Sequence, residues 1–121
     1  HFTAQALILG YTKGTGGRAL GALHVGQVKP DAEIQNRGKV GSGFTDRGMQ
    51  DLLGELSDAR RQKKLTKGGP PDDPDNVWVE PSLVCEVRYS SLTPDGAFRE
   101  PVFLRMRPDL TAADCLVEDE Q

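Results

Sequence analysis

The sequence predicts an all-β domain with a single helix. Several short stretches alternate apolar with polar residues, which is the period of half-buried strands. Glycine-rich turns separate these stretches, and only the stretch from Met49 to Ala59 has apolar residues at helical spacing. The expected order is therefore three strands, one helix and two further strands.

The first 44 residues predict the three leading strands. Ala4–Thr12 is apolar on both faces, Ala19–Val28 follows a glycine-rich turn, and Ile34–Gly41 follows a polar loop over residues 29–33. The turn Lys13–Arg18 has glycines between two cations, but it lacks the phosphate-cradling Gly-x-x-x-x-Gly-Lys pattern and leads into a strand. We therefore interpret it as a hairpin turn, whose cations either are solvated or contact a DNA backbone.

The single helix is expected to begin after Thr45. This threonine is a suitable N-cap, and Asp46 in the first turn complements the helix dipole. The apolar face comprises Met49, Leu52, Leu53, Leu56 and Ala59. Five cations close the helix and begin the next loop, where they complement the helix dipole or contact DNA: Arg60, Arg61, Lys63, Lys64 and Lys67. A surface loop over Gly68–Asn76 follows.

The stretch from Trp78 to Asp109 predicts a long strand, a turn and a final strand. Apolar residues alternate with Glu86 and Arg88 up to Tyr89, and Thr93-Pro94-Asp95-Gly96 has the chemistry of a tight turn. On the last strand, Phe103, Arg105 and Arg107 are expected to share one face. Two cations on one face suit a phosphate, although such a pair is also common on a solvated strand.

Length and charge are consistent with one small domain. The chain has 121 residues and a net charge of −3. Residues 1–67 carry eleven Lys and Arg against six acids, so the first half could meet a polyanion. We assign residues 1–110 to the domain and residues 111–121 to an acidic tail or linker. No apolar run approaches the roughly 20 residues that span a bilayer, and we expect a cytoplasmic protein.

The two cysteines predict no metal site. Cys85 is expected in the core and Cys115 is expected as a thiol of the tail. Their number and spacing suit a reducing compartment.

The order of elements is typical of an OB-fold, a five-stranded Greek-key barrel with a helix between strands 3 and 4, although short strands alone also fit other small barrels. The pattern Trp78, Pro81, Leu83-Val84, Glu86-Val87, then Arg99-x-Pro101-x-Phe103 and Arg107-x-Asp109 resembles the C-terminal OB domain of ATP-dependent DNA ligases. The resemblance is greatest to the ligase domain of bacterial non-homologous end-joining enzymes. Gly21-Ala22-Leu23 and the run Lys39–Phe44 resemble the same family.

The resemblance implies a domain that contacts nicked duplex DNA and closes over the ATP site while the ligase is adenylated. The residues it implies at the ATP phosphates are Arg99, Phe103, Arg105, Arg107 and Asp109. Those expected at the DNA backbone are Lys13, Arg18, Arg37 and Lys39. One departure is Leu110, which occupies the position where the family commonly has a lysine.

The chain lacks the catalytic lysine of such an enzyme. Ligases adenylate a lysine in a Lys-x-Asp-Gly motif, but Thr93 lies two residues before Asp95-Gly96. The chain also begins at His1, so we expect a piece of a longer protein, inactive alone. ATP and Mg²⁺ then belong to the intact ligase, and an upstream nucleotidyltransferase domain is the partner within the same chain. We expect a monomer in the bacterial nucleoid.

The alternative is an independent OB-fold module that binds nucleic acid without an enzymatic role. A single-strand binder of that kind uses aromatic platforms on which bases stack. This chain has 6% aromatic residues, which favours the ligase interpretation.

Overall fold

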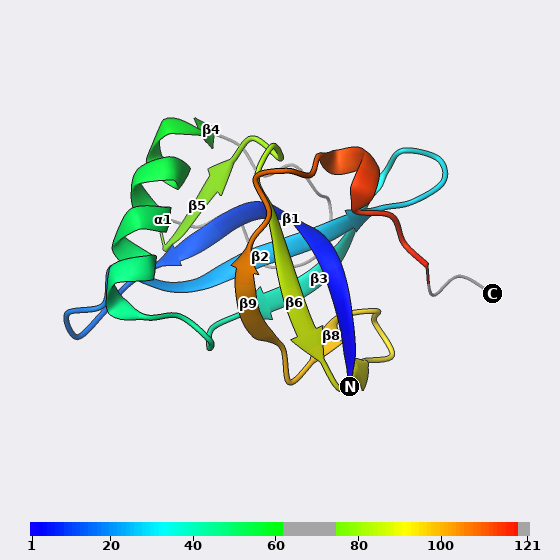
Figure 1. Cartoon of the computed structure of the whole chain (residues 1–121), viewed down its shortest axis with the longest axis horizontal. Helices are drawn as coiled ribbons and strands as arrows, with labels where there is room; N and C mark the ends of the chain where they lie inside the picture. The colour runs from blue at the N-terminus through cyan, green and yellow to red at the C-terminus, as the bar shows by residue number, and fades with distance from the viewer. Residues whose placement is uncertain (62–74, 119–121) are drawn as a thin grey trace.

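The computed structural model describes residues 1–61 and 75–118. These residues form nine β-strands, one α-helix and one short 3-10 helix (Figure 1). In chain order the elements are β1 (Phe2–Lys13), β2 (Leu20–Val28), β3 (Ile34–Val40), α1 (Asp46–Asp58), β4 (Arg60–Arg61), β5 (Asn76–Val79), β6 (Val84–Tyr89), β7 (Ser91–Leu92), β8 (Phe98–Arg99), β9 (Val102–Met106) and η1 (Ala112–Asp114).

Strand β1 is the centre of the main sheet. Its first half pairs with β6, its last residues pair with β5, and β2 runs along its other edge, all antiparallel. Gly10 allows β5 to approach, because a Cβ at this position would lie 2.6 Å from both the Trp78 ring and the Val77 carbonyl oxygen. A single long strand thereby joins both halves of the sheet.

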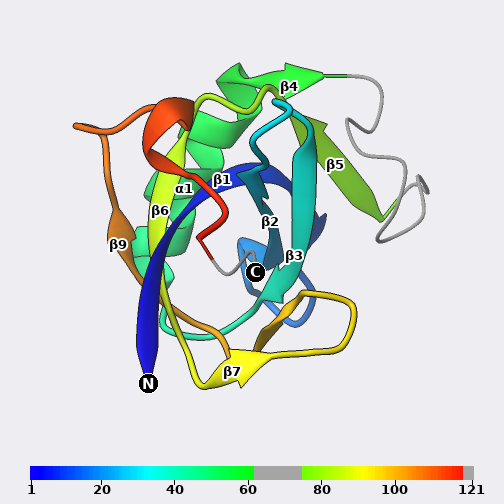
Figure 2. The same cartoon turned by 90° about the vertical axis from the view of Figure 1, so that its right-hand side faces the viewer.

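The sheet curls around a core that α1 closes at one end. The Phe103 N–H in β9 donates to the Ser42 carbonyl just after β3, at 2.9 Å, and so links two distant strands. Viewed end-on, the strands surround the centre and α1 lies behind them (Figure 2). Met49, Leu52 and Leu56 are the residues that α1 buries. Its N-cap is Thr45, as predicted, whose Oγ1 accepts from the Gly48 N–H at 2.9 Å; such a cap contributes about 1 kcal/mol.

The predicted fold class, an OB-fold with one helix after the third strand, is confirmed, but two elements differ from expectation. The long strand expected from Trp78 to Tyr89 is broken into β5 and β6, since residues 80–83 form a turn around Pro81, which has no N–H to donate to a ladder. Arg60 and Arg61 do not close the helix; they form β4, which pairs with β5. Lys63, Lys64, Lys67 and most of the expected loop Gly68–Asn76 lie outside the described residues.

Residues 111–117 belong to the fold rather than to a free tail. The Val28 N–H donates to the Cys115 carbonyl at 2.7 Å, and the Val117 N–H donates back to the Val28 carbonyl at 2.9 Å. Cys115 is buried against Leu7 and Leu9, the outward-facing apolar residues of β1. The expectation that residues 111–121 form a tail, with Cys115 as its thiol, is therefore wrong for residues 111–117. This contact also explains why β1 is apolar on both faces.

Candidate functional site

A β-bulge in β9 decides the direction of the terminal arginines. Val87 pairs with Phe103 and the adjacent Glu86 pairs with Arg105, so Leu104 is an extra residue. Such a residue reverses the alternation of the strand. Phe103 consequently packs on the main core, whereas Arg105 faces outward beside Glu86. The expectation that Phe103 shares a face with Arg105 and Arg107 is wrong, and the two arginines share the outer face.

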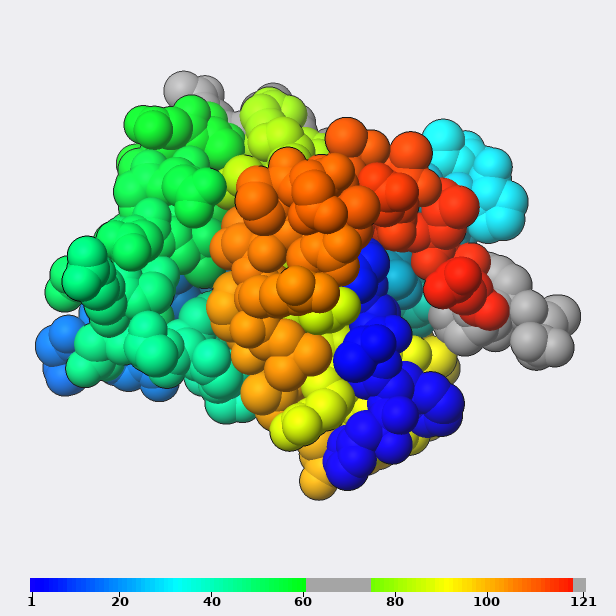
Figure 3. All heavy atoms as spheres, in the orientation of Figure 1, coloured from blue at the N-terminus to red at the C-terminus, as the bar shows by residue number. Residues whose placement is uncertain are grey.

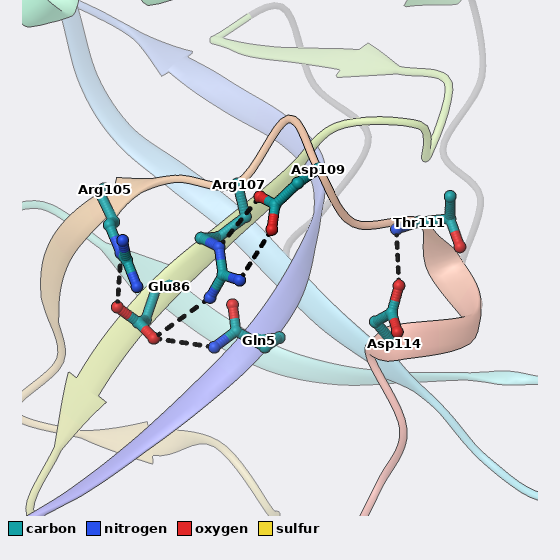
Figure 4. Close-up of polar contacts among 7 residues, drawn as sticks. All are labelled: Gln5, Glu86, Arg105, Arg107, Asp109, Thr111 and Asp114. Carbon is teal, nitrogen blue, oxygen red and sulfur yellow. Dashed lines mark hydrogen bonds and ion pairs between the residues drawn. The ribbon is translucent and has the colours of Figure 1, made fainter.

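Glu86 is the residue that both arginines meet (Figure 4). Its Oε1 accepts from Arg105 Nε at 2.9 Å, and its Oε2 lies 3.6 Å from Arg107 Nη1. The same Oε2 accepts from Gln5 Nε2 on β1 at 2.9 Å. The hydrogen bond from Gln5, together with that from Arg105, lowers the pKa of Glu86, so the carboxylate is ionised at neutral pH.

Arg107 also makes a two-point contact with Asp109. Arg107 Nε lies 3.1 Å from Oδ1, and Nη2 lies 2.9 Å from Oδ2. These bonds raise the pKa of Arg107 and lower that of Asp109, so both groups carry their charges at neutral pH. Planar, two-point recognition of a carboxylate is the same geometry that a guanidinium uses for phosphate.

The site lies on an open surface. Residues of β9, orange in Figure 3, run along the middle of this face between α1 and the C-terminal segment. The side chain of Arg105 is 62% exposed and that of Asp109 is 61% exposed, whereas Arg107 is 20% exposed. Arg105 contacts Glu86 through its Nε atom. Within the described part of the chain, the two terminal nitrogens of Arg105 are therefore left toward solvent. The arrangement suits an anion that approaches from outside.

Phe103, which was expected at the ATP phosphates, packs against the main hydrophobic core. Its ring stacks on Phe44 with 4.5 Å between centroids. Gly43 has a φ of +96°, and a Cβ there would collide with the Phe103 carbonyl oxygen. The glycines before Phe44 therefore let this corner approach β9, which gives a physical reason for the family-like run Lys39–Phe44.

Two other positions of the terminal pattern lie apart from the arginine pair. Arg99 is exposed on β8, in the two-stranded sheet with β7 rather than in the main sheet. Leu110, in place of the family's lysine, packs against the cluster of Leu7, Leu9, Val84 and Cys115. Its apolar side chain thus helps hold the C-terminal segment on β1.

Three of the four cations expected at DNA are exposed. Lys13 ends β1, Arg18 lies in the following turn, and Lys39 is near the end of β3. Arg18 Nη2 lies 3.4 Å from the Gly41 carbonyl oxygen, so the β1–β2 turn contacts the segment that follows Lys39. The three cations therefore come from neighbouring parts of one end of the sheet.

Arg37, the fourth, does not reach the surface. Its side chain is 2% exposed, and its Nε donates to Gln27 Oε1 at 3.0 Å and its Nη1 to the Gly96 carbonyl at 2.7 Å. Asn36 pairs with Gly26 and Gly38 pairs with Val25, so Arg37 is itself a bulge residue. The bulge turns the arginine inward over Phe98, at 5.7 Å from its centroid. The expected DNA contact of Arg37 is replaced by a structural role.

The described part of the chain offers neither a candidate metal site nor a candidate membrane-spanning helix. Within residues 1–61 and 75–118, no cluster of three or more His, Cys, Asp or Glu side chains could hold a metal ion. In the same ranges, no helix has the length and apolar character needed to cross a bilayer. Cys85 and Cys115 are both free and buried, and burial raises the pKa of the Cys85 thiol to about 12.

Sequence comparisons match this chain to one protein family. Residues 16–110 match the model of the ATP dependent DNA ligase C terminal region. The multifunctional non-homologous end joining protein LigD of Pseudomonas aeruginosa is 39% identical over 115 residues, which is 91% of this chain and 14% of the relative. The LigD of Mycolicibacterium smegmatis is 35% identical over 96% of this chain and 16% of its own length. The chain thus spans about a seventh of these curated relatives.

Solved structures agree with the sequence matches. The ligase domain of LigD from M. tuberculosis superposes with a TM-score of 0.87 at 30% identity, over 97% of this chain and 39% of that one. A mycobacterial DNA ligase D in complex with ATP and MES superposes with a TM-score of 0.80 at 29% identity, over 97% of this chain and 38% of that one.

Proposed function

Because this chain belongs to the family of the C-terminal region of ATP-dependent DNA ligases, we propose that it is the OB-fold part of a larger ligase of the bacterial end-joining type. In that enzyme it has two tasks: it contacts nicked duplex DNA, and it closes over the ATP site while the ligase is adenylated. The reaction it serves joins a 5′-phosphate to a 3′-hydroxyl in DNA repair or end joining. The upstream nucleotidyltransferase domain supplies the nucleophilic lysine.

The paired arginines on the outer face are the observation that carries this proposal. Arg105 and Arg107 are held side by side by Glu86 on a solvent-facing surface. When the domain closes, these guanidinium groups contact the β- and γ-phosphates and orient pyrophosphate for in-line departure. This is positioning and charge stabilisation, which dominate catalysis of phosphoryl and nucleotidyl transfer. The decisive experiment separates adenylation from sealing in an Arg107→Ala enzyme.

Bound ATP supplies the nucleotide that is transferred, and Mg²⁺ offsets the charge of its phosphates. We assign the metal to the rest of the intact enzyme, because the two carboxylates beside the arginines, Glu86 and Asp109, are already engaged with them, and the described residues contain no cluster of three or more possible metal ligands. The intact ligase is proposed to work as a monomer in the bacterial nucleoid.

The isolated 121-residue chain is expected not to form a covalent enzyme–adenylate. Thr93 lies two residues before Asp95-Gly96, where the nucleophilic motif would need lysine. The structure places Thr93 and Gly96 in a turn closed by a 2.9 Å hydrogen bond. Labelled ATP and Mg²⁺, followed by a denaturing gel, provide the measurement. A labelled band at the size of this chain would show that the nucleophile lies within it and would contradict the assignment.

Duplex DNA is expected to bind weakly and with strong salt dependence through Lys13, Arg18 and Lys39. Replacement of each cation by glutamine should flatten the slope of log K against log salt by about 0.9 if it contacts one phosphate. Lys29 on the β2–β3 loop is a suitable control, because this loop lies at the other end of the sheet from the β1–β2 turn (Figure 1). Unchanged slopes in all three variants, or an equal change in Lys29→Gln, would place the DNA elsewhere.

A further inference from the structure

We propose that Glu86, held by Gln5, is a positioning residue that sets Arg105 and Arg107 in place before a phosphate arrives. The inference rests on the proposed function of the two arginines. It assigns to the acidic residue between them a task that is separate from contact with the nucleotide.

The backbone places three of these side chains in a row. Gln5 on β1 is directly opposite Glu86 on β6, and Glu86 is directly opposite Arg105 on β9. Cross-strand neighbours of this kind have their Cβ atoms only about 4.5–5.5 Å apart. The ladders therefore fix the distance between the carboxylate and the strand that carries the arginines. Arg107 reaches the same carboxylate from just beyond the end of β9.

Glu86 holds both arginines from the protein side, whereas Asp109 contacts Arg107 alone, at the solvent side. The side chain of Glu86 is 16% exposed, in contrast to the 61% of Asp109. Because Glu86 engages Arg105 through Nε, the outer nitrogens of that guanidinium stay available. A phosphate that arrives from solvent can exchange with Asp109 at Arg107 without displacing Glu86. The strand residue thus holds both cations in the free and in the bound state.

The orientation of the Gln5 amide supports the assignment. Gln5 Nε2 donates to Glu86, while Gln5 Oε1 is buried without a partner among the described residues. A reversed amide would set its oxygen against the carboxylate, so the charge of Glu86 fixes the amide even though one acceptor stays unpaired. Figure 4 shows this amide beside Glu86 and Arg107. The half-buried Gln5, with its amide oriented in this way, donates to one oxygen of the carboxylate and so favours the rotamer of Glu86 that faces the arginines.

Glu86→Gln in the intact ligase is the test. The variant should fold, because the Gln5 amide can reverse and accept from the new side-chain NH₂. We expect single-turnover self-adenylation to slow by about 10- to 100-fold, the range typical when a residue that orients a functional group is lost. Sealing of a pre-adenylated nick should be unchanged. Glu86→Asp, which keeps the charge, should recover part of the adenylation rate, and Glu55→Gln on the exposed face of α1 is the matched control.

A double-mutant cycle separates positioning from general stabilisation. If Glu86 acts through the arginines, Glu86→Gln should add no further loss to an Arg105→Ala/Arg107→Ala enzyme. A full additional loss in that background, or normal adenylation by Glu86→Gln when Arg107→Ala is slow, would overturn the positioning role. If the Arg107→Ala enzyme itself adenylates at the normal rate, the proposed function of the arginines is wrong, and the positioning role of Glu86 is wrong with it.

Discussion

Arg107→Ala in the intact ligase is expected to slow self-adenylation by about 10²–10³-fold, the usual effect of losing one preorganised charge contact to a transition state. Sealing of a pre-adenylated nick should change little, because the phosphates of ATP are present only in the first step. The structure supports a selective effect. Arg107 follows the last strand, and its side-chain contacts with Glu86 and Asp109 lie on the outer face, away from the core. Its removal therefore should leave the barrel intact.

Single-turnover rates of the two steps, measured separately, provide the readout, with a melting curve as the control for folding. Arg88→Ala is the matched variant, since Arg88 is an exposed arginine on the neighbouring strand β6. A general need for positive charge on this surface would slow both variants alike. If Arg107→Ala depressed adenylation and sealing equally, with a lower melting temperature, Arg107 would be a structural residue.

Arg37→Ala is expected to destabilise this domain by about 3–5 kcal/mol, a typical cost of deleting a large buried side chain that also satisfies buried acceptors. The change leaves Gln27 Oε1 and the Gly96 carbonyl without the donors that Arg37 provides. It also removes the cation packed over Phe98, at 5.7 Å from the ring centroid, and leaves a cavity. The loss should appear as a lower denaturation midpoint with an unchanged m-value.

Lys39→Ala is the matched control for Arg37, because it removes the same charge two residues farther along β3 from an exposed position. Its effect on stability should stay within about 0.5 kcal/mol. DNA affinity should show the reverse pattern under conditions where both variants are folded, with a loss for Lys39→Ala and none for Arg37→Ala. An Arg37→Ala domain of normal stability and reduced DNA affinity would restore Arg37 to the surface role that its sequence pattern suggested.

The two bulges show where strand periodicity stops being a sufficient guide. Alternation predicts that Arg37 lies on the same face as Lys39, and Phe103 on the same face as Arg105. A bulge breaks the alternation in each case: in β3 Arg37 is itself the extra residue, and in β9 the extra residue is Leu104, between Phe103 and Arg105. A bulge is defined by the partner strand, which here lies about ten residues away for β3 and about seventeen away for β9. The local sequence contains little signal for it, apart from Gly38 with its φ of +95°.

The acidic residue that contacts both arginines, Glu86, could not be recognised as their partner from the sequence, for a related reason. Glu86 was recognisable as an outward residue of its strand, but its contacts with Gln5 and Arg105 depend on the register of three strands. Gln5 is separated from Glu86 by 81 positions along the chain. The apolar outer face of β1, with Leu7 and Leu9, was the available signal that something covers it. Composition made the covering segment look like a tail, because the chain ends in the acidic run Glu118-Asp119-Glu120.

By itself, the sequence determined the features that arise from neighbouring residues. Strand and helix periods, the Thr45 cap, the order of elements and the family pattern around Trp78–Asp109 are local, so they were predictable and led to the OB-fold and the ligase family. Only the tertiary structure decided the register of the ladders. That register turns Arg37 and Phe103 inward, brings Arg105 and Arg107 onto Glu86, and docks Cys115 on β1. The physical reason is that pairing between distant strands, not the order of residues within one strand, sets which side chains meet.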